Sequence, residues 1–272
     1  MKLNGRTILI TGGSAGIGLA FALKFLELGN VVIVTGRRQA ALDEVKARYP
    51  RLHTIQSDVA DPAQIVTLAR RLKADFPKLD VLMNNAGVSV YRNLKVPAAD
   101  LVGLMAEMNI NVGGVIGMIS AVIDVLTANK GTVINVSSAL AFVPLPAAPI
   151  YSATKAAIHS YTQSLRFQLE DTGVEVIEIM PPAVKTDMTA DLAEGDGVIL
   201  ITTDELVKQS FASLKAGAVE IRPGQAKQLA FMRRLAPDFI NGQLWKASRK
   251  LVPVGVKATS SRPLEQQAAT TA

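Results

Sequence analysis

The stretch TILITGGSAGIGLAFALKFLELG, residues 7–29, decides the fold of this chain of 272 residues. It begins as a β-branched, strand-like run, breaks into several glycines between Gly12 and Gly18, and continues as an apolar, helix-like pattern. Glycines let the backbone approach a pyrophosphate closely, and the N-terminus of the following helix stabilises its charge. This order of strand, glycine turn and helix is typical of a dinucleotide site, although an ordinary strand-to-helix turn has the same order.

Outside this stretch, short β-branched runs alternate with longer helix-like segments. The strand-like runs lie at 31–36, 53–58, 81–87, 131–138 and 174–182, and the helix-like segments at 39–48, 62–75, 100–127 and 152–171. The runs are almost continuously apolar, as expected for a parallel sheet that helices cover on both faces. We predict an α/β fold, a doubly wound Rossmann-like parallel sheet in a single domain, with ligands bound beyond the carboxyl ends of its strands.

The composition argues against several kinds of protein. The chain has no cysteine and only two histidines, so we expect no disulfide and no metal site. The net charge of +6 is concentrated in residues 222–272, which hold nine Lys and Arg against two Asp and Glu. A basic footprint over the whole domain is missing, so we expect no nucleic-acid partner. Neither a signal peptide nor an apolar run of about 18 residues is visible, and we expect a cytoplasmic protein.

Tyr151 and Lys155 are four residues apart in PIYSATKAAIHSYTQSL, and Ser138 precedes them at the end of a strand-like run. On a helix, positions four apart share a face. A nearby cation favours phenolate, so we expect Lys155 to lower the pKa of Tyr151 and to make the phenol a usable acid or base. An ordinary amphipathic helix with a surface lysine has the same spacing.

Several short motifs occur together in a characteristic order. They are T-G-x-x-x-G-x-G at 11–18, NNAG at 84–87, NINVGG at 109–114, NVSS at 135–138, YSATK at 151–155 and PPAVKT at 181–186. With them the chain resembles the short-chain dehydrogenase/reductase family, in its classical branch, over about residues 5–190. PPAVKTDMT together with EIRPGQAK also resembles the DltE-like subset of these oxidoreductases.

The resemblance implies a catalytic set of Asn111, Ser138, Tyr151 and Lys155. In this family reading, Ser138 donates a hydrogen bond to the substrate carbonyl and Tyr151 protonates it. Lys155 binds the ribose hydroxyls of the nicotinamide. Asn111 lies among three glycines in an apolar helix-like segment, where it can open the helix locally. By resemblance the freed carbonyl holds a water that completes a proton path; a merely kinked core helix is the alternative.

The resemblance also implies a cofactor site. Its residues are Gly12, Ser14, Gly16, Ile17, Gly18, Arg37, Arg38, Asp58, Val59, Asn85, Ala86, Gly87, Tyr151, Lys155, Val184 and Thr186. Asp58 and Val59 look like adenine contacts, whereas Asp58 or Asp61 could simply cap the helix that begins at Pro62. The residues of NNAG are expected to hold the central sheet as much as the cofactor.

The end of the second strand-like run predicts which nicotinamide is used. An NAD-selective enzyme usually has a carboxylate there, but this chain has Gly36, Arg37 and Arg38. Arg37 can make charge-assisted hydrogen bonds to a 2′-phosphate, so we predict NADP(H) over NAD(H). A solvated pair of arginines at a helix start is the alternative.

Beyond the motifs, we divide the chain into a catalytic domain at 1–221 with a substrate lid at about 187–210, a basic helical extension at 222–257 and a disordered tail at 258–272. Apolar residues beside Ser138 and in the lid suggest a mostly apolar pocket, although such residues are more often simple core: Leu140, Phe142, Val143, Leu145, Pro146, Leu192 and Val198. The extension reads as two short amphipathic helices that pack on the domain or on a second subunit. Membrane contact through Trp245 is the less favoured alternative.

These observations predict an NADP(H)-dependent oxidoreductase that interconverts a small carbonyl compound and an alcohol, with Tyr151 as general acid and base. We expect a homodimer or homotetramer. The alternative is a non-catalytic protein that senses a dinucleotide or acts as a scaffold on the same fold.

Overall fold

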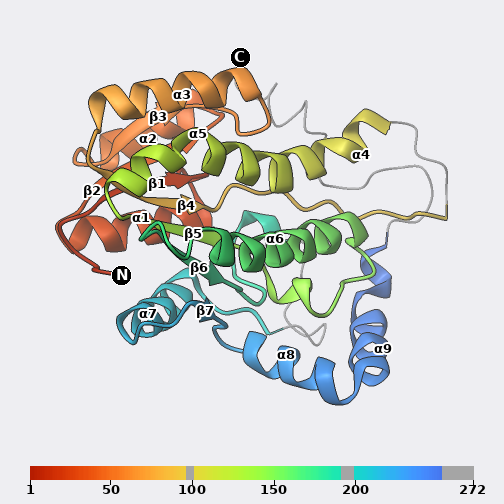
Figure 1. The fold of residues 1–272 in the computed structure, drawn as a ribbon. Helices are drawn as coiled ribbons and strands as arrows, with labels where there is room; N and C mark the ends of the chain where they lie inside the picture. Colours follow the sequence, from red (N-terminus) through yellow and green to blue (C-terminus); the bar gives the residue numbers. More distant parts are fainter. Residues whose placement is uncertain (96–100, 191–198, 253–272) are drawn as a thin grey trace.

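The computed structural model describes residues 1–95, 101–190 and 199–252 (Figure 1). A seven-stranded sheet with parallel pairing forms its centre, in the order β3-β2-β1-β4-β5-β6-β7. The strands are β1 (Thr7–Thr11), β2 (Val31–Gly36), β3 (His53–Gln56), β4 (Leu79–Asn84), β5 (Thr132–Val136), β6 (Glu175–Ile179) and β7 (Glu220–Ile221). The predicted doubly wound α/β fold is confirmed.

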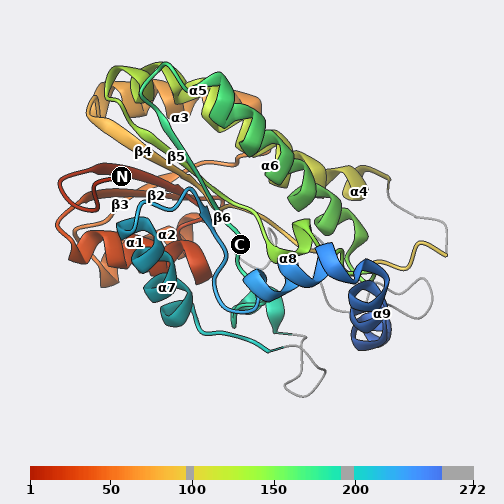
Figure 2. The same ribbon diagram turned by 60° about the horizontal axis from the view of Figure 1, so that its bottom comes forward.

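Helices cover both faces of the sheet. They are α1 (Gly16–Glu27), α2 (Gln39–Arg48), α3 (Pro62–Asp75), α4 (Leu101–Met108), α5 (Gly114–Ala128), α6 (Pro149–Gln168), α7 (Thr203–Lys215), α8 (Ala226–Leu235) and α9 (Pro237–Ser248). Figure 2 shows α3, α5 and α6 on one face and α1, α2 and α7 on the other. Each face has its own buried apolar cluster, one centred on Phe21 and Phe25 and the other on Met118 and Val122.

The strand order reverses direction between β1 and β4, and this switch places the candidate site. The chain moves outward from β1 to β3, then returns to β4 on the other side of β1 and continues to β7. The helices that follow β1 and β4 therefore cover opposite faces of the sheet, and ligands bind at the carboxyl ends of the strands at such a switch point. The glycine turn at 12–18 and the NNAG motif both lie at this switch point.

Local chemistry explains where α3 and α6 begin. The Asp61 carboxylate accepts hydrogen bonds from the backbone N–H groups of Ala63 and Gln64, and Pro62 occupies the first turn of α3. Pro149 has the same place in α6, which therefore begins three residues before the predicted 152. Asp61, not Asp58, is the cap of α3.

The apolar segment predicted at 100–127 is one long helical run with a defect. α4 passes into a π-helical turn, η1 (Asn109–Gly113), which passes into α5. Among the described residues this run, 101–128, is the one helix that is long and apolar enough to cross a membrane, by length and composition. The expectation that no such run exists was wrong, but here the run packs against α3, β4 and α6.

The C-terminal part holds the main differences from prediction. The short strand β7 pairs with β6 and was not predicted. α7 starts at a capping box of Thr202 and Glu205 and buries Leu206 and Phe211, so the predicted lid at 187–210 includes a helix of the core layers. Residues 191–198, including Leu192 and Val198 of the predicted pocket, and the tail at 258–272 lie outside the described residues.

Candidate active site

Ser138 and Tyr151 meet at the carboxyl edge of the sheet. Ser138 follows β5 in extended backbone and begins the short turn η2 (Ala139–Ala141), where its Oγ accepts a hydrogen bond of 3.1 Å from the N–H of Leu140. Tyr151 lies in the first turn of α6, and its hydroxyl shares a hydrogen bond with Ser138. Both hydroxyls therefore face the same point.

Lys155 lies one turn further along α6 and is 5% exposed. Its Nζ donates a hydrogen bond of 2.8 Å to the carbonyl oxygen of Val136 and lies 5.5 Å from the centre of the Tyr151 ring. Burial lowers the pKa of Lys155 to about 8, partly offset by the negative charge of Glu178. An ammonium group has three donors, so two N–H groups remain for a ligand.

The pKa of Tyr151 differs from expectation. It is raised to about 12, chiefly because burial disfavours the phenolate; the hydrogen bond from Ser138 lowers it, and the nearby Glu107 and Tyr91 raise it further. The predicted lowering by Lys155 is wrong for this structure. The four-residue spacing brings the ammonium near the ring, but Nζ is directed to the Val136 carbonyl.

Asn111 lies in the π-helical turn η1 and is 1% exposed. Its Nδ2 donates to the Val88 carbonyl (2.8 Å) and to the Thr154 hydroxyl (3.1 Å), and its Oδ1 accepts from the Val88 N–H (2.9 Å). The regular α-helix is interrupted at Asn111, as predicted, but the side chain bonds outside its own helix, and the predicted freed carbonyl stays a prediction. Its side chain joins the loop after β4 to α6 beside Lys155.

The turn after β1 fits a pyrophosphate because its positions have no room for side chains. Gly12 has φ +64°, and a Cβ there would lie 2.9 Å from the Cα of Ala86. A Cβ at Gly18 would collide with the carbonyl oxygen of Gly12. The Nδ2 of Asn85 fixes the turn through hydrogen bonds of 3.0 and 3.1 Å to the carbonyls of Thr11 and Gly12.

The N-terminus of α1 completes this cradle. Its cap, Ala15, offers no side-chain hydrogen bond, and its first turn holds no acidic residue, so the backbone N–H groups are open to an anion. Thr186 lies against Gly16, with its Cγ2 3.4 Å from the position of a Cβ there. Gly16, Ile17, Val184 and Thr186 line one cavity. The residues present therefore fit a dinucleotide.

The predicted adenosine end lies beyond β2 and β3. Arg37 and Arg38 are exposed at the end of β2, and Ser14 lies beside Gly36. The Asp58 carboxylate accepts a hydrogen bond of 2.9 Å from the Ala60 N–H. Val59 is buried against Gly114, where an added Cβ would lie 2.9 Å from the Val59 side chain.

A single cavity of about 570 Å³ joins the glycine turn to the Ser138 and Tyr151 hydroxyls. Ala86, Gly87 and Lys155 line it, as do Leu140 and Leu145 of the predicted pocket. The other predicted apolar residues with described positions lie outside its lining. Val143 is fully buried, and Phe142 packs edge-on against His159 and under Arg222. Pro146 does not line the cavity either.

The C-terminal extension contributes the residues that sequence reasoning missed. Seven of its side chains line the cavity: Gln225, Leu229, Ile240, Gln243, Leu244, Ser248 and Leu251. The apolar positions recur at helical spacing, which predicted two helices but not the surface that they would cover.

A buried polar network behind the site was also missed. Glu178 on β6 is inaccessible to solvent, accepts a hydrogen bond from the Ser137 hydroxyl and contacts His159 Nδ1 at 2.8 Å. His159 is two turns after Tyr151 on α6, so Tyr151, Lys155 and His159 follow one face of the helix. The network connects α6 to β6 beside the predicted catalytic side chains.

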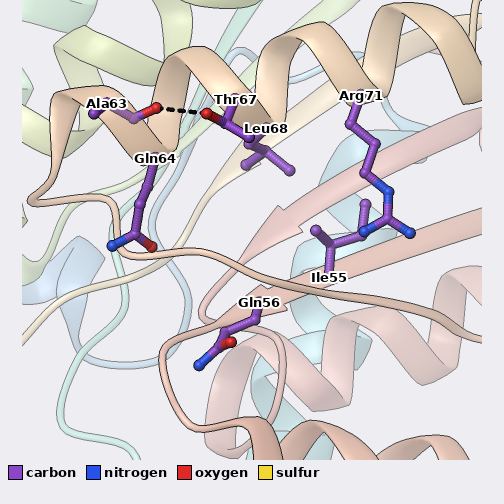
Figure 3. A pocket seen from close by; sticks show the side chains of 7 residues that line it. All are labelled: Ile55, Gln56, Ala63, Gln64, Thr67, Leu68 and Arg71. Atoms are coloured by element: carbon purple, nitrogen blue, oxygen red, sulfur yellow. Dashed lines mark hydrogen bonds between the residues drawn. The ribbon is translucent and has the colours of Figure 1, made fainter.

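A second hollow, of about 250 Å³, lies between α3 and β3 (Figure 3). Its single charged side chain is Arg71, which pairs with Asp75 at 3.3 Å, and the Thr67 hydroxyl is satisfied by the carbonyl of Ala63 at 2.9 Å. None of the predicted site residues lines it. No cluster of metal-ligating side chains occurs among the residues that the structure describes.

Comparison with known proteins agrees with this geometry. The profile of short chain dehydrogenases matches residues 6–197. The chain belongs to the short-chain dehydrogenase family. It is 41% identical over 225 residues to the uncharacterized oxidoreductase DltE of Bacillus subtilis (strain 168), covering 81% of this chain and 89% of that protein. The resemblance to this family and to its DltE-like members is thus confirmed.

Two further members illustrate the range of the short-chain dehydrogenase family. Sulfoacetaldehyde reductase 2 of Chromohalobacter salexigens is 31% identical over 196 residues, which cover 70% of this chain and 77% of that protein. The crystal structure of a short chain dehydrogenase from Burkholderia cenocepacia J2315 in complex with NADP superposes with a TM-score of 0.79 at 29% identity, covering 90% of this chain and 99% of that one. The chain is therefore an oxidoreductase of a family that uses a nicotinamide dinucleotide.

Proposed function

We propose that this short-chain dehydrogenase is an NADP(H)-dependent carbonyl reductase that converts a ketone or aldehyde to an alcohol. The observation that carries the proposal is the meeting of the Ser138 and Tyr151 hydroxyls in the cavity that also contains the glycine turn. A site that reduces a carbonyl needs a cofactor-binding turn and hydroxyl donors in the same cavity. In this protein the glycine turn, Ser138 and Tyr151 line one cavity.

The chain's own residues supply donors for the substrate oxygen. Ser138 and Tyr151 hydrogen-bond the carbonyl oxygen, where negative charge develops during reduction, and Tyr151 transfers its phenolic proton to that oxygen. Fixed donors at this point stabilise the transition state more than the ground state. Because burial raises the pKa of Tyr151 to about 12, the phenol is protonated at neutral pH and acts as an acid. This is the protonation state that the reduction step requires.

A bound nicotinamide dinucleotide supplies the hydride. The glycine turn and the N-terminus of α1 would hold its pyrophosphate, with Thr186 beside them. Lys155 has two unused N–H donors for the ribose hydroxyls, and its hydrogen bond to Val136 fixes the ammonium. Asn111 holds the loop after β4 against α6, and so maintains the position of Lys155.

The NADP(H) preference rests on the end of β2. Arg37 and Arg38 are exposed there, and Gly36 offers no carboxylate to bind ribose hydroxyls or to repel a phosphate. The NADP-bound structure from Burkholderia cenocepacia has the same fold at 29% identity, which supports the proposal without carrying it.

The decisive experiment is the reduction of a panel of aldehydes and ketones with NADPH by the wild type and by Tyr151→Phe. Loss of a positioned acid lowers the rate by about 100- to 10,000-fold, so we expect Tyr151→Phe to lose turnover and to keep NADPH binding. Tyr161→Phe is the matched control, since Tyr161 lies on the same helix but does not line the cavity. Undiminished turnover of Tyr151→Phe would refute the proposal, and tight NADPH binding without any turnover would favour a sensing role.

A further inference from the structure

The two C-terminal helices form a wall of the active-site cavity. In Figures 1 and 2 they lie outside the sheet and its two helical layers. Ile240, Leu244 and Ser248 recur every four residues along α9 and all line the cavity, so one face of this helix is turned toward it. Gln225, the N-cap residue of α8, and Leu229 on α8 line the cavity as well.

The wall is fixed to the catalytic loop. Arg233 Nε on α8 donates a hydrogen bond of 3.1 Å to the carbonyl oxygen of Phe142, four residues after Ser138. The guanidinium of Arg222 lies 5.3 Å from the centre of the Phe142 ring, and the Gly224 N–H donates to Gln209 Oε1 on α7 at 2.7 Å. These contacts fix α8 and the segment before it against the loop that follows Ser138.

The wall is uncharged although the segment that forms it is basic. Its lining side chains are leucine, isoleucine, glutamine and serine, whereas Lys227, Arg233, Arg234, Lys246 and Arg249 lie outside the lining. Apart from tyrosines, the ionisable side chains that line the described cavity are Lys155 and Asp187. The one cation among these lining residues, Lys155, is assigned to the cofactor ribose, and the α8 and α9 lining offers an anionic substrate group no positive charge. Burying an unpaired charge is costly.

Ser248 gives the wall one buried polar point. It is 2% exposed, and within the described part of the chain its Oγ has no hydrogen-bond partner. A buried hydroxyl without a partner is unfavourable, and a ligand can satisfy it as either donor or acceptor. The surrounding Leu244 and Leu251 leave an apolar path toward it.

Resting on the proposed reductase activity, we propose that the substrate is a neutral carbonyl compound with an apolar body, enclosed by α8 and α9 of the same chain and hydrogen-bonded by Ser248 at its far end. Sulfoacetaldehyde, in the name of one relative, carries a sulfonate that this wall does not match. The selectivity of this chain therefore differs from what that name alone would imply.

A pair of substrates that differ only in charge tests the neutral wall. Methyl 6-oxohexanoate and 6-oxohexanoate have the same aldehyde and chain, but the second ends in a carboxylate. We expect kcat/KM with NADPH to be about 100-fold or more higher for the ester, because the acid would bury an unpaired charge. Equal values, or a preference for the acid, would overturn the proposal.

Variants on α9 test the role of the helix. Leu244→Ala should lower kcat/KM for the ester about tenfold or more by leaving a gap in the wall. Ser248→Ala should lower it by about tenfold for the ester and leave hexanal, which has no distal polar group, unchanged. Phe239→Ala is the matched control, since Phe239 is on the same helix, 58% exposed and outside the lining. If Leu244→Ala and Phe239→Ala behave alike, the wall does not contact substrate.

Calorimetric titration separates this inference from the reductase proposal, because it needs no turnover. Protein saturated with NADP⁺ is titrated with hexanamide and with hexanoate. We expect tighter binding of the amide, weakened in Leu244→Ala and unchanged in Phe239→Ala. That result without any turnover would support substrate binding by α8 and α9 and would refute the proposed reductase activity. Equal binding of amide and acid, or no effect of Leu244→Ala, would refute the proposal that α8 and α9 bind a neutral substrate.

Discussion

Lys155 is buried, yet its proposed contact with the cofactor ribose requires that it carry a charge. Its ammonium has a carbonyl partner at 2.8 Å and the negative charge of Glu178 nearby, and burial still lowers its pKa to about 8. Tyr151, one turn earlier, is shifted in the opposite direction, to about 12. In the free protein, the lysine therefore loses its proton before the phenol does as the pH rises.

This order predicts the pH dependence of reduction. With the pKa of Lys155 lowered, its charged form predominates below about pH 8 and is lost above it. kcat/KM for NADPH reports groups of the free enzyme, so we expect it to be flat below about pH 8 and to fall by about tenfold per pH unit well above it. Lys155→Arg stays charged and should lose this fall, at a lower absolute rate. A wild-type profile that is flat to pH 9.5 would contradict the assignment.

Arg37 decides the proposed cofactor preference at the level of one side chain. If its guanidinium binds the 2′-phosphate, Arg37→Ala should raise KM for NADPH by about 10- to 100-fold and leave KM for NADH nearly unchanged, because a charge-assisted hydrogen bond contributes about 1.5–3 kcal/mol. Arg48→Ala is the matched control: Arg48 is an exposed residue at the end of α2 that lies over the Tyr49 ring. Equal rises for both cofactors would remove Arg37 from the phosphate site.

At the scale of elements, two adjacent glycines in very different surroundings lie where the π-helical turn η1 ends and α5 begins. Gly113 and Gly114 both have right-handed helical backbone, with φ of −56° and −60°. A Cβ at Gly113 would meet nothing within 4 Å, whereas one at Gly114 would lie 2.9 Å from two carbon atoms of the Val59 side chain. The close packing against Val59 therefore requires a glycine at position 114, whereas position 113 has room for a side chain.

Alanine substitutions at the two positions should have opposite effects. Gly113→Ala is expected to raise the free energy of unfolding by about 0.4–1 kcal/mol, since it restricts the unfolded chain without a clash. Gly114→Ala is expected to lower it by about 1–3 kcal/mol through overpacking against Val59. Urea denaturation of both variants measures the difference. Equal signs would show that the turn relaxes around an added methyl group.

Elements determined by nearby residues could be predicted from the sequence. The glycine turn after β1 and the cap before Pro62 follow from the residue types in place, and both occur in the structure. Asn111 interrupts its helix as predicted, but its hydrogen-bond partners Val88 and Thr154 lie far along the chain. β7 was missed because its two residues are a strand only through their pairing with β6. The spacing of Tyr151 and Lys155 predicted their proximity, but the direction of Nζ depends on Val136 in another element.

At the scale of the whole molecule, the chain's two histidines respond to pH in opposite ways. The hydrogen bond to Glu178 is the main cause that raises the pKa of His159; the charges of Glu178 and Glu220 raise it further, while burial and Arg222 lower it. Burial, and to a lesser extent Lys46, lowers the pKa of His53. Each shift makes the stability of the fold depend on pH.

The raised pKa of His159 and the lowered pKa of His53 predict opposite changes of stability with pH. A raised folded-state pKa contributes stability that is present below the unfolded pKa of about 6.5 and is lost as pH rises through the folded value. The stability advantage of the wild type over His159→Gln should therefore shrink between pH 5.5 and 8.5, whereas its advantage over His53→Gln should grow. Urea denaturation at several pH values measures both. A constant difference for His159→Gln would mean that its bond to Glu178 is not linked to protonation.

The wall built by α8 and α9 stands outside the sheet and its two helical layers, and α8 fully buries only Ala226. Changes on these helices therefore reach the ligand while leaving the two apolar clusters of the sheet untouched. Most destabilising substitutions act through a packed core, so we expect substitutions in this segment to cost less stability than substitutions in the two apolar clusters. After a gene duplication, a copy of this chain could acquire a new substrate by drift in one terminal hairpin of helices, with its hydride chemistry inherited intact.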